Sequence, residues 1–276
     1  MKSKFYITAL FILSSLLLWT ACSDSSTGNI PDDLTGESVS YELSPANDSS
    51  IDGKVTFDER VDGDVQVTIE LNGLEEEEEY RVGVYNNSAI EEGGLLIDLK
   101  SVEGSAGENK LIITVDEDGE SITYDDLLES NAHIRVYLSG DTDTVLAHAD
   151  IGGNALTGES LELELEEVDE SGVSGEIRFH ERENGTVLAV IELTGISGAD
   201  NPIAHLHEEE SDADLFIFEP VDSETGISRS QMAELEDGTP FAFDDLDELH
   251  AHIKIFPSES DDTVLARADL GSADEE

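Results

Sequence analysis

GKVTFDERVDGDVQVTIELNG, residues 53–73, is the stretch that decides the fold, because the chain contains it twice. It recurs 122 positions later, at residues 175–195, as GEIRFHERENGTVLAVIELTG. In residues 65–71, apolar side chains alternate with polar ones. A period of two indicates a β-strand with one buried face. The chain is therefore expected to contain two copies of a β-rich unit.

The repeat extends over most of the chain. Thr35–Ser38 matches Thr157–Ser160 at the same offset of 122, whereas Tyr124–Leu127 matches Phe243–Leu246 at an offset of 119. The second copy therefore lacks three residues between these blocks. A period this long predicts a duplicated domain and not a stacked array of short repeats.

Each copy is expected to consist of short strands and tight turns. Leu161, Leu163 and Leu165 alternate with glutamates, and in residues 65–71 the polar set Gln66, Thr68 and Glu70 is expected to face solvent. Turn signals occur at Asp62-Gly63, Asn184-Gly185 and Asp237-Gly238. This pattern favours an all-β antiparallel sandwich or barrel. One short helix is predicted in each copy, at Asp125–Ser130 and Asp244–Leu249. The chain has no dinucleotide fingerprint and no phosphate-binding loop.

The charge of the chain is extreme. Its 276 residues include 66 acidic and 13 basic side chains, a formal charge of −53. This excludes nucleic acid as a partner and disfavours anionic lipid headgroups. Self-repulsion destabilises such a chain in dilute buffer, and molar salt screens it. We interpret the acidity as halophilic. Calcium binding at Asp116–Gly119 or Asp141–Asp143 is the second interpretation, although neither loop completes an EF-hand.

The N-terminal segment resembles a bacterial lipoprotein signal peptide. It has Lys2 and Lys4, an apolar run from Phe5 to Trp19, and then Thr20-Ala21-Cys22. The resemblance implies that Cys22 becomes the lipidated first residue of an exported protein, anchored at the outer membrane or cell surface. An ordinary secretory signal is the alternative. The expected organisation is a signal peptide at 1–21, an acidic tether at 22–34, and β-domains at 35–154 and 157–272.

Two histidine pairs lie in the second copy. His205-Leu206-His207 is predicted on a strand, where a spacing of two places both imidazoles on one face. His250-Ala251-His252 is expected to open another strand with the same geometry. If the two strands are neighbours, four imidazoles converge, a set that suits zinc or copper. The alternative is ordinary polar surface.

The second copy resembles a CHRD (chordin-type) domain. The resemblance rests on Ile203–His207, Leu215–Glu219, Pro220-Val221-Asp222, Phe243–Leu246 and the closing block Ile253–Gly271. The first copy resembles a more divergent version. CHRD domains are similar to copper/zinc superoxide dismutases in their His-x-His strand, which implies two tandem Greek-key or immunoglobulin-like β-sandwich domains.

Two departures from that family bear on function. Its late strand usually reads Asn-Val-His, whereas this chain has Lys254-Ile255-Phe256. The first copy has Gly83 and Tyr85 in place of the histidine pair. Superoxide is an anion, and a surface this acidic repels it without a local cation. We find no complete catalytic constellation and assign no catalytic residue.

Two functions follow as hypotheses. The first is a non-enzymatic envelope lipoprotein that needs no cofactor and acts as a binding or structural module for a protein or glycan outside the cytoplasm. The alternative is a copper- or zinc-binding, dismutase-like metalloprotein that uses His205, His207, His250 and His252.

The halophilic interpretation predicts a strong salt dependence of stability. We expect the melting temperature of the mature chain to rise between dilute buffer and molar potassium chloride, because salt screens the repulsion between carboxylates. Circular dichroism at both salt concentrations measures it. An unchanged melting temperature would contradict the interpretation.

Overall fold

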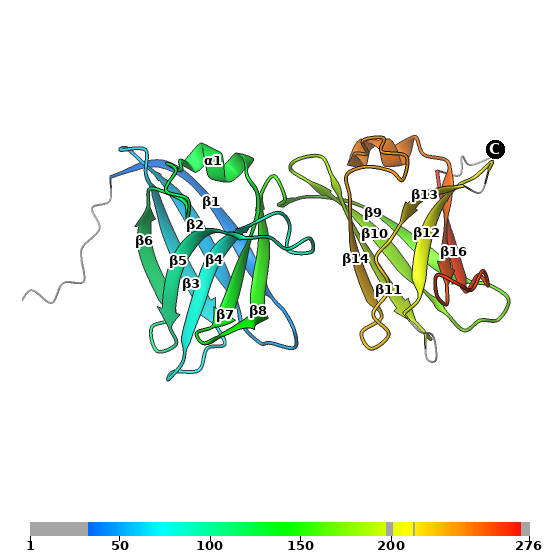
Figure 1. Cartoon of the computed structure of the whole chain (residues 1–276), viewed down its shortest axis with the longest axis horizontal. Helices are drawn as coiled ribbons and strands as arrows, with labels where there is room; N and C mark the ends of the chain where they lie inside the picture. Colours follow the sequence, from blue (N-terminus) through cyan, green and yellow to red (C-terminus); the bar gives the residue numbers. More distant parts are fainter. Residues whose placement is uncertain (1–32, 197–200, 212, 272–276) are drawn as a thin grey trace, which may run out of the picture. The chain divides into compact units, whose positions relative to one another are not determined.

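The computed structural model describes residues 33–196, 201–211 and 213–271, and these form two antiparallel eight-stranded sheets (Figure 1). The predicted all-β class is therefore confirmed. The predicted signal peptide, Cys22 and the tether up to residue 32 lie outside the described residues. Among the residues that are described, no helix is long and apolar enough to cross a membrane.

The first domain comprises residues 34–152. Its elements are β1 (Leu34–Pro45), β2 (Asp52–Arg60), β3 (Val65–Asn72), β4 (Glu79–Asn86), β5 (Leu95–Glu103), β6 (Glu108–Ile113), α1 (Tyr124–Glu129), β7 (Asn131–Leu138) and β8 (Asp141–Gly152). The strand order is β5-β4-β7-β8-β1-β2-β3-β6. Strand β1 pairs with β2 along most of its length but with β8 only at Ser44 and Pro45. It therefore joins two four-stranded halves, and the end strands β5 and β6 approach each other as the sheet curls.

The second domain, residues 156–270, repeats this topology. Its elements are β9 (Leu156–Glu167), β10 (Ser174–Arg182), β11 (Val187–Thr194), β12 (Ile203–Glu208), β13 (Asp214–Ile217), β14 (Ile227–Met232), the 3₁₀ helix η1 (Phe243–Asp247), β15 (Ala251–Phe256) and β16 (Ala266–Leu270). The order β13-β12-β15-β16-β9-β10-β11-β14 matches the first sheet strand for strand. Neighbours that are not consecutive, such as β12 and β15, give Greek-key connections.

Each domain has its own apolar core, formed by the inward face of its sheet. Val65, Val67 and Ile69 are fully buried, and Leu165 is buried on β9, so the predicted alternation is confirmed. Gln66 is an exception. It was expected to face solvent but is buried, and its Nε2 donates a hydrogen bond to Oδ2 of Asp58 at 3.2 Å. A polar side chain on the outer face is therefore not always exposed.

The turn predictions are confirmed. Gly63, Gly185 and Gly238 all have φ between +78° and +90°, which glycine adopts without strain. The two predicted helices differ from each other. Thr123 accepts a hydrogen bond from the Asp126 backbone and caps α1, whereas Ala242 at the matching position has no hydroxyl, and the second segment forms only the 3₁₀ helix η1.

The loop between the fourth and fifth strands contains the three-residue deletion. Tyr85 pairs with Leu95 in the first domain, and His207 pairs with Asp214 at the equivalent place in the second. Eight residues, 87–94, separate these strands in the first domain, and five, 209–213, separate them in the second, of which residue 212 lies outside the described residues. The difference between the offsets of 122 and 119 is therefore taken up in this loop.

The cores predict large losses of stability on truncation. Phe57 and Phe179 occupy equivalent, fully buried positions. We expect Phe57→Ala and Phe179→Ala each to lower the free energy of unfolding by about 3 to 5 kcal/mol. Urea unfolding in high salt measures it, with Val61→Ala, which removes an exposed side chain, as the control. A loss no larger than that of the control would contradict this assignment of the core.

Candidate metal site on the second domain

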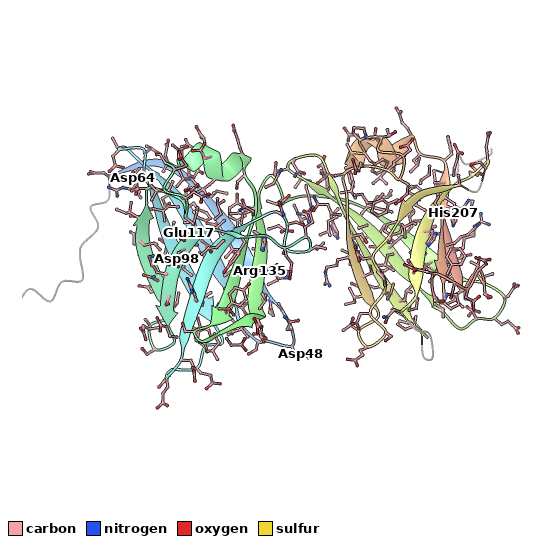
Figure 2. All side chains as sticks on the ribbon, in the orientation of Figure 1. Asp48, Asp64, Asp98, Glu117, Arg135 and His207 are labelled. Atoms are coloured by element: carbon pink, nitrogen blue, oxygen red, sulfur yellow. The ribbon has the colours of Figure 1, made fainter. Side chains whose placement is uncertain are left out.

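Strand β12 places His205 and His207 on the outer face of the sheet. Ala204 and Leu206, which alternate with them, are fully buried in the core. The two imidazole rings stack with centroids 5.7 Å apart. The prediction that they share one face is therefore confirmed. Figure 2 labels His207 on the second domain.

The carboxylate of Asp214, the first residue of β13, contacts both histidines. Its Oδ1 lies 3.0 Å from Nδ1 of His205 and 3.2 Å from Nδ1 of His207. One ligand atom from each of these three residues lies within 4.8 Å of the other two. The side chain of His207 is only 9% exposed, that of His205 19% and that of Asp214 43%, so the cluster opens to solvent on the carboxylate side.

The second histidine pair is placed differently from the prediction. Strand β15 begins at Ala251, so the expectation that His250 opens this strand is wrong, and its side chain is exposed. His252 pairs with His207 across the two strands, and their rings stack 5.5 Å apart. The converging ligand group contains His205, His207 and Asp214, and neither His250 nor His252 belongs to it.

A small pocket lies over this cluster. Its volume is about 190 Å³, and it is lined by His205, His207, Asp214, Phe256, Ser258, Glu259, Asp261 and Asp262. The Phe256 ring packs edge-on against both imidazoles, with centroids 5.2 Å from His205 and 6.0 Å from His207. Two imidazole nitrogens and one carboxylate oxygen are donors that suit zinc or copper, and such a three-residue set leaves a coordination position open.

Within residues 34–152, all of which the structure describes, the first domain has no equivalent cluster. The positions of His205, His207 and Asp214 are taken by Gly83, Tyr85 and Leu95, none of which is a usual ligand for zinc. Here the longer loop 87–94 contacts the face of the sheet.

Three hydrogen bonds between backbone atoms of loop 87–94 and side chains of the sheet hold the loop in place. The Asn87 carbonyl accepts from Nδ1 of His133 at 2.8 Å, and the Ala89 carbonyl accepts from Nη2 of Arg135 at 3.3 Å. The Ala89 amide donates to Oδ1 of Asp150 at 2.8 Å. Arg135 also lies 5.7 Å from the Tyr85 ring centroid, and Figure 2 labels it on the first domain. The loop thus occupies the face that carries the pocket in the second domain.

Burial lowers the pKa of His133 below its ordinary value, and the hydrogen bond to the Asn87 carbonyl opposes this shift only in part. His133 matches His252 in the second copy and stacks on Tyr85 with centroids 5.7 Å apart. Burial also lowers the pKa of His148, which pairs with Arg135 on the neighbouring strand. Burial therefore favours the neutral form of both rings.

Comparisons of the chain with protein-family models and with curated proteins found no match. The resemblance to CHRD domains therefore stays a prediction.

The buried His133 predicts acid sensitivity of the first domain. The folded domain keeps the ring neutral, whereas in the unfolded chain it takes up a proton near pH 6.5. The stability that the neutral His133 ring contributes is fully present above the pKa of the unfolded chain. It is lost as the pH falls from there toward the lower pKa of the folded domain.

Urea unfolding between pH 7.5 and pH 5.5 measures this loss. We expect His133→Gln to reduce the dependence on pH, because an amide does not titrate in this range and still donates to a carbonyl. If the variant and the parent lost stability equally over this range, the explanation would be wrong.

Proposed function

We propose that the chain is an exported lipoprotein of the bacterial cell envelope, anchored at Cys22, with two CHRD-like domains of which the second binds one zinc or copper ion. The observation that carries the metal site is the convergence of His205, His207 and Asp214. Binding is the role we assign to the protein, and no catalytic step is part of the proposal.

The choice of metal follows from the donor atoms. Imidazole nitrogen suits zinc and copper, whereas calcium and magnesium take mainly oxygen ligands. His205 and His207 present two nitrogens from one strand, so the site favours the first pair of metals. The acidic surface also raises the local concentration of cations near the pocket.

The lining of the pocket favours binding over superoxide dismutation. Superoxide is an anion, and a site that uses it needs a cation that attracts it. Among the residues that the structure describes, no Lys or Arg lines the pocket, whereas Glu259, Asp261 and Asp262 do. Arg229 is not among the lining residues, and neither is Lys254, which pairs with His205 across β12 and β15. A cation is therefore the better ligand for this pocket.

Zinc titration of the mature chain, purified without a His tag in molar potassium chloride, tests the proposal. We expect one zinc ion per chain, measured by isothermal titration calorimetry and elemental analysis. The His205→Ala/His207→Ala double variant should lose it, because both nitrogen ligands are removed. The control is His250→Ala, which removes an exposed imidazole outside the ligand group and should bind as the parent does.

Equal zinc content in the double variant and the parent would refute the site, and so would a parent that binds neither zinc nor copper. If His250→Ala lost zinc, His250 would be a ligand, and the four-histidine site predicted from the sequence would be correct.

A further inference from the structure

The connection between the last two strands differs in the two domains. In the first domain, β7 and β8 are joined by Ser139 and Gly140, and their pairing reaches Leu138 and Asp141. In the second domain, pairing of β15 with β16 ends at Ile255 and Ala266. Pro257 follows β15 directly, and proline has no backbone N–H to donate to a ladder. Residues 257–265 therefore form a loop, which we name the acidic loop.

The acidic loop forms part of the wall of the pocket that contains the two histidines. Ser258, Glu259, Asp261 and Asp262 line it together with His205, His207 and Asp214. The loop also begins next to Phe256, whose ring packs against both imidazoles. The second copy thus departs from the first in its ligand residues and in this loop, and both changes meet at one pocket.

The carboxylates of the acidic loop have different roles. Oδ1 of Asp261 accepts a hydrogen bond from the Thr263 amide at 3.0 Å, and the Asp261 amide donates to the Ser258 carbonyl at 3.2 Å. Asp261 therefore shapes the loop. Glu259 and Asp262 are exposed, and Glu259 takes the position of Gly140 in the first copy. Asp261 is exposed as well, but its Oδ1 is already engaged by the Thr263 amide, so Glu259 and Asp262 are the two carboxylates of the loop that we consider as ligands.

We propose that the acidic loop supplies a carboxylate, from Glu259 or Asp262, as a further ligand to the metal ion that His205, His207 and Asp214 hold. This inference rests on the proposed function. Four carboxylates in one pocket repel one another, and a bound divalent cation offsets that repulsion and draws the loop toward the ion. The result is a closed site, which is typical of a metal that is held and not of one that turns over substrate.

Zinc and cobalt binding to the Glu259→Gln/Asp262→Asn double variant tests the inference. We expect its zinc dissociation constant to rise about tenfold or more, since loss of supporting groups alone changes metal affinity by that factor. The visible bands of bound Co²⁺ should shift in the variant, because a carboxylate oxygen is lost from the coordination shell. The single variants then identify which of the two residues is the ligand.

The matched control is Glu164→Gln/Glu192→Gln, which removes two exposed charges of the same domain outside this pocket. It separates coordination from the general attraction of cations by the acidic surface, and we expect its affinity and cobalt spectrum to match those of the parent. If both double variants weaken binding equally, or if neither changes the affinity and spectrum, neither Glu259 nor Asp262 is a ligand and the inference is wrong. If His205→Ala/His207→Ala still loses zinc when the loop variants do not, the proposed function stands and only this inference fails. A parent chain that binds no metal would overturn the proposed function and the inference together.

Discussion

The burial of one face of each curled sheet is the constraint on which the rest of the structure depends. Side chains alternate between the two faces of a strand, so a buried Leu206 forces His205 and His207 to the outer face together. The same constraint fixes the register, because a shift by one residue would turn both histidines into the core and Leu206 out to solvent. The geometry of the candidate metal site is thus a consequence of core packing.

The duplication provides an internal comparison for that site. Both domains have the same strand order. At equivalent positions, Tyr85 stacks on His133 in the first domain and His207 stacks on His252 in the second. They differ in the loop after the fourth strand. In the first domain, residues 87–94 are hydrogen-bonded across the face of the sheet, and Ser88 within them is fully buried. In the second domain the loop is three residues shorter, and a polar pocket lies on this face. Figure 1 shows the two sheets in which this comparison is made.

Much of the fold could be predicted from the sequence, because its signals are local. Alternation along residues 65–71, the Asp-Gly and Asn-Gly turns and the internal repeat all depend on neighbouring residues or on direct matching. That His205 and His207 share one face could also be predicted locally, because they are two residues apart on one strand. Asp214 could not be predicted, because its contact with both imidazoles depends on how β12 pairs with β13. Gln66 likewise has its neighbours set by strand pairing, with Asp58 on β2 and Ile112 on β6, and no pattern in the sequence indicated its burial.

The central claim is that the second domain holds a metal ion with two imidazoles and carboxylate oxygen. X-ray absorption spectroscopy at the zinc edge of the zinc-loaded protein tests it most directly, because scattering from imidazole rings gives their number. The account predicts two imidazole nitrogens at about 2.0 to 2.1 Å and carboxylate oxygens at about 2.0 to 2.2 Å. A spectrum with four imidazoles, or with oxygen ligands and no imidazole, would contradict it.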